Sequence, residues 1–406
     1  MDAATDSSLY KAIKEGNINS MKQLIIANHE HFGTGDHYLL QEMTTHLNNN
    51  SLHIAAQFNQ VECLEEIFNI CPSLLIKQNS EGDTALHIAS RLKLDNVVRK
   101  LIDWAGNSAS DGELTKLQQL VRMTNKKNDS ALHETLQCVD SRSNLVLPLL
   151  IDADPGFDYL ANDAGETPLY LAVRYAPFSE IKYILDKSPS QAHGAPGGRT
   201  VLHISVRINR LAVTEELLLK KPHIVKEVDR DGRSALHYAA LLYRSCAFEN
   251  ILDVDSSVGY LRDKDGMTAL HYVAGNYYNL RSMDIFFYKM KEMNEKLSEC
   301  CPDCWEIRDN KGRNFLHIAA ENRKVQFFTY IFQGMPSSPT NDLMVMHLLN
   351  QRENNGKTPC DLLLSEVPDE FTADRNMCLR IIKLDPRSRH FMHQRDYNLD
   401  VSLKNR

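Results

Sequence analysis

The chain has 406 residues, of which 43% are hydrophobic and 24% are charged, and its formal net charge is -7 at pH 7. Because this length exceeds one compact core of ordinary size, the sequence predicts either two or three globular domains or one elongated repeat array. The negative net charge argues against a nucleic-acid-binding protein, because such proteins usually carry an excess of Lys and Arg that contacts the phosphate backbone.

The N-terminal region does not resemble a secretion signal, because Asp2 and Asp6 stand where a signal peptide has a basic region and an apolar segment. The richest apolar stretch, Leu145 to Ile151, is far shorter than the roughly 18 residues of a membrane span. Nine cysteines are scattered without the paired spacing of a disulfide framework. These features predict a cytosolic or nuclear protein in a reducing compartment.

A short phrase of the form Gly-x-Thr/Ser-x-Leu-His-x-Ala recurs along the chain. Its Leu positions include Leu202, Leu236 and Leu270, which are 34 residues apart, and this interval is typical of ankyrin repeats. We therefore expect an all-α ankyrin-repeat solenoid over residues 1–365, with about ten helix-turn-helix repeats and short turn hairpins. The repeats are expected to start near residues 5, 45, 79, 125, 162, 195, 229, 263, 309 and 353, and a polar tail is expected over 366–406.

Each phrase also predicts a local structure. Asp229-Arg230-Asp231-Gly232 supplies a tight turn in which Gly takes a positive φ, and the following Thr or Ser caps a short helix. Such short helices cannot stand alone, so only stacking on neighbouring repeats buries their apolar faces. The longer interval near Tyr288 to Leu297 is expected to be an extended outer helix.

Two segments near the C-terminus carry a more specific resemblance. Cys300-Cys301-Pro302-Asp303-Cys304-Trp305-Glu306 runs into a repeat at Asp309, and a last half-repeat follows at Asn354-Asn355-Gly356-Lys357-Thr358-Pro359. Together these segments resemble plant ankyrin membrane proteins of the accelerated-cell-death type. The resemblance implies a role in defence signalling and control of cell death, with a multi-span membrane domain, named for a Pro-Gly-Gly motif, after the last repeat.

The sequence given ends without such a domain, so we expect a truncated or fragmentary member or a soluble paralogue. Pro196-Gly197-Gly198 is not a remnant of the motif, because Arg199-Thr200-Val201-Leu202-His203 follows it and makes it a repeat turn. If the family resemblance extends to location, the protein is cytoplasmic or lies at the cytosolic face of the plasma membrane.

Histidine recurs at one place in the repeat, which predicts a structural role. Each such His is placed to hydrogen-bond the Thr or Ser three residues earlier and a backbone group of the next turn. The positions are His53, His87, His133, His203, His237, His271 and His317.

No motif predicts a catalytic, cofactor or metal site. Cys300, Cys301 and Cys304 have a spacing that suits zinc, but a structural zinc site needs four ligands and no fourth is apparent nearby, which favours simple thiols. The stretch from Gly194 to Thr200 lacks the Gly-Lys-Ser/Thr end of a phosphate loop, and no Gly-x-Ser-x-Gly or His-Glu-x-x-His phrase occurs. We therefore expect no enzyme, no cofactor and no bound metal.

The remaining candidate is the concave surface that ankyrin arrays form from turn tips and the exposed side of the first helix. Mixed charge with apolar and aromatic side chains is typical of a protein-binding groove. The register assigns to this surface, outside the stack, Phe58, Arg91, Arg174, Tyr175, Arg207, Ile208, Arg230, Asp231, Arg233, Leu241, Leu242, Lys264, Asp265, Met267, Asn310, Lys311, Arg313, Glu321 and Asn322.

The sequence thus predicts a protein-interaction scaffold, with a protein partner on the concave face and no nucleic acid. The alternative is a membrane-associated signalling regulator whose membrane domain is truncated or supplied by a partner. In support of that alternative, the segment from Arg375 to Arg395 carries several cations that could face an anionic leaflet, although Asp385 dilutes them. Membrane contact is then indirect, or through a missing C-terminal domain.

Overall fold

A computed structural model describes residues 3–32, 40, 47–108, 114–137, 144–155, 157–187, 194–275, 283–324, 328 and 339–366. The chain divides into two compact units, unit 1 (Met1–Ile204) and unit 2 (Ser205–Arg406), which are described separately. The polar tail predicted over 366–406, with its cations between Arg375 and Arg395, lies outside the described residues from residue 367 on. The predicted division of residues 1–365 into ten repeats stays a prediction.

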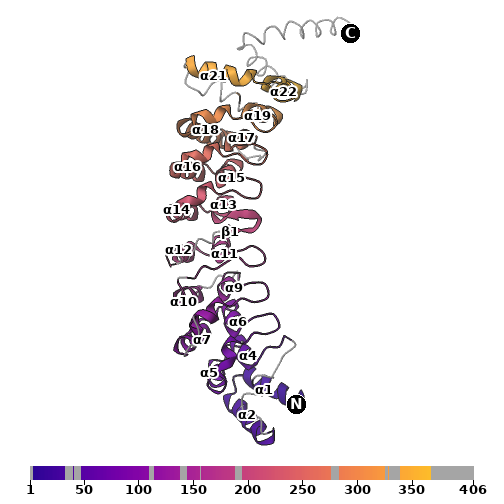
Figure 1. The fold of residues 1–406 in the computed structure, drawn as a ribbon, viewed down its shortest axis with the longest axis vertical. Helices are drawn as coiled ribbons and strands as arrows, with labels where there is room; N and C mark the ends of the chain where they lie inside the picture. The colour runs from indigo at the N-terminus through magenta and orange to yellow at the C-terminus, as the bar shows by residue number, and fades with distance from the viewer. Residues whose placement is uncertain are drawn as a thin grey trace, which may run out of the picture. The chain divides into compact units, whose positions relative to one another are not determined.

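Unit 1 is built from pairs of antiparallel helices that stack on one another (Figure 1). It begins with α1 (Ala3–Lys14) and α2 (Ile18–Phe32). Inner helices α4 (Ser51–Gln57), α6 (Ala85–Arg91), α9 (Ala131–Gln137) and α11 (Pro168–Tyr175) pack in sequence. The outer elements are α5 (Val61–Ile70), η1 (Pro72–Ile76), α7 (Asp95–Asn107), α8 (Lys116–Arg122), α10 (Val146–Ala153) and α12 (Phe178–Lys187).

Unit 2 repeats this arrangement. Helix α13 (Val201–Arg207) contains the boundary between the units, and inner helices α15 (Ala235–Leu241), α17 (Ala269–Gly275), α19 (Phe315–Glu321) and α22 (Pro359–Glu366) follow. The outer elements are α14 (Leu211–Lys220), η3 (Pro222–Lys226), α16 (Ser245–Val254), η4 (Ser256–Tyr260), α18 (Met283–Cys300), η5 (Pro302–Glu306) and α21 (Pro339–Asn350). The extended outer helix predicted at Tyr288–Leu297 is confirmed as part of α18.

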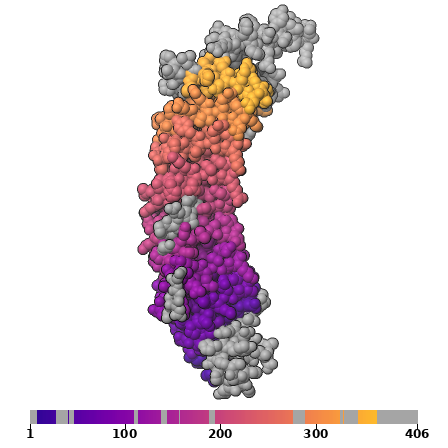
Figure 2. All heavy atoms as spheres, viewed as in Figure 1, coloured from indigo at the N-terminus to yellow at the C-terminus, as the bar shows by residue number. Residues whose placement is uncertain are grey.

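The inner helices are too short to be stable in isolation, and burial explains why they form. In α15 the six residues from Ala235 to Ala240 are all buried. Ser234 precedes them in an extended conformation and forms a reciprocal cap with His237, so the predicted Ser/Thr cap is confirmed. Side chains of successive repeats lie against each other within each unit (Figure 2), which supplies the burial that a seven-residue helix needs.

Strand structure within the described residues is limited to turn hairpins. The longest is β1 (Gly194–Ala195) paired antiparallel with β2 (Arg199–Thr200), joined by η2 (Pro196–Gly198). Gly197 and Gly198 have φ values of 81° and 73°, which only Gly adopts at low cost. The Pro-Gly-Gly phrase is therefore a repeat turn, as the sequence predicted, and the all-α ankyrin fold is confirmed.

Candidate protein-interaction surface

The turns that lead into the inner helices share one construction. Asp229 Oδ1 accepts hydrogen bonds from the backbone N–H groups of Asp231 and Arg233, both at 2.9 Å. Gly232 then takes a φ of 79°, as the sequence predicted. The same paired acceptor occurs at Asn79, Asn125, Asn162, Asp263 and Asp309. The side chain that starts each turn therefore fixes the conformation of its tip.

Backbone hydrogen bonds also join the tips of successive turns. In unit 2 the N–H of Lys264 donates to the carbonyl of Asp231, and the N–H of Asn310 donates to that of Asp265, both at 2.9 Å. In unit 1 the N–H groups of Ser80, Lys126 and Asp163 make the equivalent bonds. We call this series the tip ladder. It leaves the side chains at the tips projecting from a backbone that is already hydrogen-bonded.

The recurring histidines tie each inner helix to the next turn. His237 Nδ1 accepts from the N–H of Ser234 at 3.0 Å, and its Nε2 lies 3.1 Å from the carbonyl of Met267 in the next repeat. Because Nδ1 is an acceptor, Nε2 carries the proton and donates. Equivalent bonds to the next turn are made by His53, His87, His133, His271 and His317. The predicted pair of bonds, to a Thr or Ser three residues earlier and to the next turn, is confirmed at His87, His133, His237 and His271. At His53 and His317 the residue three positions earlier is Asn50 and Asn314 instead, and at His203 the bond to Thr200 is confirmed.

Burial keeps these imidazoles neutral. It lowers the pKa of His271 to about 4, because the charged form would lose its hydration, and carbonyl acceptors offset this only in part. The pKa values of His53, His133 and His317 are likewise lowered to about 4, and those of His87 and His237 are also lowered. A group held neutral and hydrogen-bonded at both nitrogens is suited to packing rather than to proton transfer.

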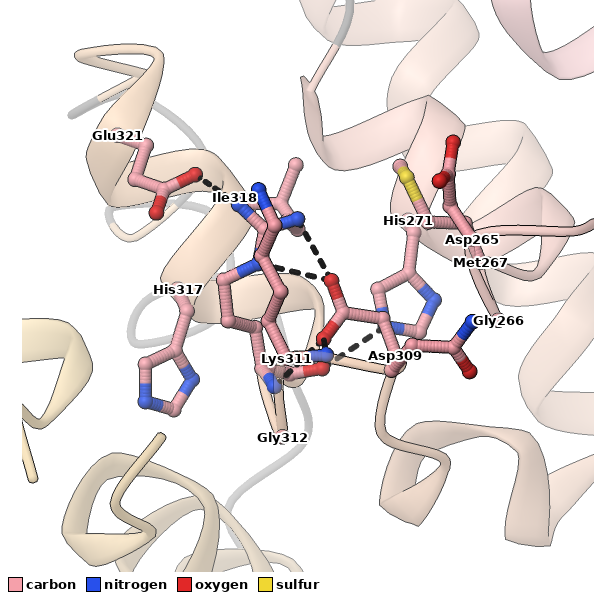
Figure 3. A network of polar contacts seen from close by, with 12 residues as sticks. Asp265, Gly266, Met267, His271, Asp309, Lys311, Gly312, His317, Ile318 and Glu321 are labelled. Atoms are coloured by element: carbon pink, nitrogen blue, oxygen red, sulfur yellow. Dashed lines mark hydrogen bonds and ion pairs between the residues drawn. The ribbon is translucent and has the colours of Figure 1, made fainter. Parts of the chain in front are cut away.

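Asp309 is the centre of a polar network at the start of one inner helix (Figure 3). It accepts from the N–H groups of Lys311 and Arg313, and the Arg313 guanidinium lies 2.6 Å from Asp309 Oδ2. Arg313 also pairs with Glu321 at the other end of α19. Burial would raise the pKa of the Asp309 carboxyl, but Arg313 and the N–H donors outweigh it and hold that pKa below its usual range.

Unit 1 contributes four of the predicted surface residues. Phe58 is half-buried, with the Lys14 ammonium 5.2 Å from its ring centre. Tyr175 is 42% exposed and the Arg174 guanidinium lies 4.9 Å from its ring centre. Arg91 instead is bound to Asp83 and to Glu134 of the next repeat, both of which are buried. The predicted surface residues of unit 1 thus form two pairs of a cation with an aromatic ring.

Unit 2 contributes the other residues, which fall into two groups. Exposed are Arg207, Ile208, Arg230, Asp231, Lys264, Asp265, Asn310, Lys311 and Glu321. Half-buried are Arg233, Leu241, Leu242, Met267, Arg313 and Asn322. The exposed tip residues of unit 2, which are Arg230, Asp231, Lys264, Asp265, Asn310 and Lys311, are called the tip set below.

Arg233 differs from the expectation that it lies outside the stack. Its Nε donates to the hydroxyl of Tyr272 in the next repeat at 2.8 Å, and that hydroxyl donates to Asp263 Oδ2 at 2.7 Å. Sequence reasoning did not single out Tyr272 or the equivalent Tyr238, which bonds Asp229. Both tyrosines directly follow the repeat His, so their place in the register was a usable signal.

The cysteines near the end of α18 lie in different environments. Cys301 and Cys304 are buried and Cys300 is half-buried. Burial raises the pKa of Cys301 to about 11 and also raises that of Cys304, which keeps both thiols protonated at neutral pH. No group of three or more His, Cys, Asp or Glu side chains is placed to hold a metal ion in the part of the chain that the structure describes.

The sequence is similar to known proteins. Residues 9–111 match the family model of ankyrin repeats, in three copies. The chain is also 24% identical over 206 residues to "Protein ACCELERATED CELL DEATH 6" of Arabidopsis thaliana, an alignment that covers 47% of this chain and 30% of that protein. Among the described helices, none combines the length and the apolar character needed to cross a bilayer. Ankyrin repeats are a protein-binding fold, and residues 9–111 of this chain match them; the chain is also similar over about half its length to that plant relative.

Proposed function

We propose that the chain is a non-enzymatic protein-interaction scaffold whose main recognition surface is the tip set together with neighbouring inner-helix side chains. The tip ladder is the observation that carries this proposal. Because the N–H of Lys264 and that of Asn310 are already bonded within the chain, the tip side chains are presented from a fixed backbone. Pre-organised side chains lose less conformational entropy when a partner binds.

The tip set alternates in charge. Arg230 stands beside Asp231, and Lys264 beside Asp265, and all four side chains are exposed. A partner with complementary charges of both signs would be steered into one register on this surface, and like-charge contacts would reject other registers. In unit 1, the exposed Tyr175 with Arg174 against its ring supplies the kind of anchor that carries much of the binding energy at interfaces.

The biological setting of the proposal comes from resemblance. The relative carries cell death in its name, and the Cys-rich segment before Asp309 resembles the same plant family. We assign this chain a role as the cytosolic ankyrin module of a regulator of plant defence or cell death, in the cytoplasm or at the cytosolic face of the plasma membrane. The alignment covers 30% of the relative, so the assignment rests on that shared part alone.

The test is binding by the full chain after replacement of the tip cations. We would replace Arg230, Lys264 and Lys311 together by Ala and compare partner capture from plant extract, followed by calorimetry with each captured protein. The matched control replaces three exposed cations of the outer elements, Lys220, Lys226 and Lys291.

The tip variant should fold normally and lose affinity by about tenfold or more, while the control keeps its affinity. If the control variant loses binding and the tip variant does not, the partner uses the outer helices and the proposed surface is wrong.

A further inference from the structure

A second site lies among the outer helices of unit 2, away from the tip set. A pocket of about 250 Å³ opens between the end of α13 and the outer helices α14, α16 and α18. Three cationic side chains line it, Arg210 before α14, Arg244 before α16 and Lys289 on α18, and none of its lining residues carries a carboxylate. A water molecule takes up about 30 Å³ of liquid volume, so the pocket has room for a phosphate group and several waters.

The start of α16 contributes hydrogen-bond donors to the same pocket. Ser245, Cys246 and Ala247 form the first turn of this ten-residue helix and line the pocket. The residue before them, Arg244, makes no side-chain cap to their N–H groups. The first N–H groups of a helix have no partner within the helix, and together with the helix dipole they favour a negative charge.

Arg244 supplies an independent indication of a ligand. Its Nε atom is buried and has no hydrogen-bond partner among the described residues. Arg244 as a whole is half-buried, but a buried N–H such as its Nε–H is costly without an acceptor, and an anion in the pocket would provide that acceptor. Burial also lowers the pKa of Arg210, because the charged guanidinium loses hydration at its position near the pocket.

We propose that this pocket binds a phosphate-bearing anion, with the Arg244 guanidinium and the first-turn N–H groups of α16 as its donors and with Arg210 and Lys289 as flanking cations. Lys289 Nζ lies 3.4 Å from the carbonyl of Tyr243, which holds the ammonium beside the pocket. This anion site is separate from the proposed protein-binding surface and does not depend on it.

The test uses the full chain with inorganic pyrophosphate and inorganic phosphate in calorimetric titrations, at ionic strength matched with NaCl. We expect saturable binding of one anion per chain, tighter for pyrophosphate because it can reach more of the cations. Arg244→Gln should weaken binding about tenfold, since one charge-assisted hydrogen-bonding group is removed. Lys291→Gln is the matched control, because Lys291 is exposed on the same helix as Lys289 and pairs with Glu295.

A second measurement follows the pocket directly. The exposed thiol of Cys246 lines the pocket, so bound pyrophosphate should slow its alkylation by a maleimide, measured at this residue by peptide mass spectrometry. Cys246→Asp leaves all three cations in place but puts a carboxylate in the pocket, and it should abolish pyrophosphate binding.

Absence of saturable binding, equal binding by Arg244→Gln and the wild type, or unchanged Cys246 labelling would each overturn the proposal. Binding of pyrophosphate but not of phosphate would support the proposal and would show that the ligand carries more than one phosphoryl group.

Discussion

The guanidinium of Arg91 on α6 binds the carboxylate of Glu134 on α9 through two hydrogen bonds of 2.6 and 2.7 Å. A third bond of 2.8 Å joins Arg91 to Asp83 in its own repeat. Asp83 is 4% exposed and Glu134 is 5% exposed, so one arginine neutralises two buried acids from adjacent repeats. Asn125 adds hydrogen bonds to both carboxylates.

Replacing Arg91 by Ala should therefore destabilise unit 1, because it leaves two buried carboxylates without their counter-charge. We expect a loss of about 2–4 kcal/mol in the free energy of unfolding, measured by urea denaturation. Lys100→Ala is the control, since Lys100 and its partner Glu65 are both more than 40% exposed, and solvent screening leaves such a pair with little effect on stability. Equal losses in the two variants would contradict the role given to Arg91.

Two aspartates of one turn should behave differently. Asp263 is buried and accepts bonds from two backbone N–H groups and the Tyr272 hydroxyl, so Asp263→Ala should cost about 2 kcal/mol or more in the free energy of unfolding. Asp265, two residues later, is exposed at the tip, and Asp265→Ala should change stability by about 0.5 kcal/mol or less. Thermal denaturation of both variants measures the difference, and a larger effect at Asp265 would argue against this turn construction.

The buried histidines predict a specific pH dependence. Their folded-state pKa values near 4 lie below the unfolded value of about 6.5, so the unfolded chain binds more protons between these two pH values. Stability is therefore fully present above pH about 6.5 and falls as the pH drops toward 4.

Substitution of one buried histidine tests its contribution to this pH dependence of stability. His271→Gln should reduce the slope of unfolding free energy against pH in this window by up to about 1.4 kcal/mol per pH unit. His347→Gln, which replaces an exposed histidine on α21, is measured as the control. Urea unfolding at several pH values between 4.5 and 7.5 provides the measurement, and an unchanged slope in His271→Gln would show that this imidazole is not held neutral.

Substitutions at two glycines allow the effect of backbone strain to be distinguished from the effect of steric contact. Gly232 and Gly356 both have a φ of 79°, which Ala adopts only at a cost of about 1 kcal/mol. A Cβ at Gly232 would also come within 3.0 Å of the Lys264 N atom, whereas a Cβ at Gly356 would meet no atom of the described residues within 4 Å. Gly232→Ala should thus be the more destabilising variant in thermal unfolding, and equal effects would mean that the next turn moves away freely.

Much of the repeat architecture could be predicted from the sequence, because the Leu and His positions recur at intervals that define a register. That register correctly placed His237 against the cap at Ser234 and the next turn. It could not show that Arg233 bonds Tyr272, because a register gives the face of a side chain but not which side chain of the next repeat lies within reach. The assignment of surface residues to partner binding stays a prediction.

The pocket in unit 2 was missed for a related reason. Arg210 and Arg244 occupy the same place in consecutive repeats, so the sequence register does place these two cations on neighbouring repeats. Lys289 lies on α18, the longest of the helices in Unit 2 described above, and its approach to the pocket depends on how that helix packs on α16. Helix packing of this kind is not encoded in a repeat register.

The number of residues between a repeat histidine and its hydrogen-bond partner in the next turn differs between repeats. The bond spans 30 residues from His237 to Met267 and 42 residues from His271 to Arg313. Within the described residues, part of the difference lies in the outer helix, because α18 has 18 residues while α16 has ten. Lengthening a flexible connection costs little loop-closure entropy. The outer side is therefore where this chain can gain or lose sequence during evolution, or accept an inserted tag, without changing the spacing at which its turns meet a partner.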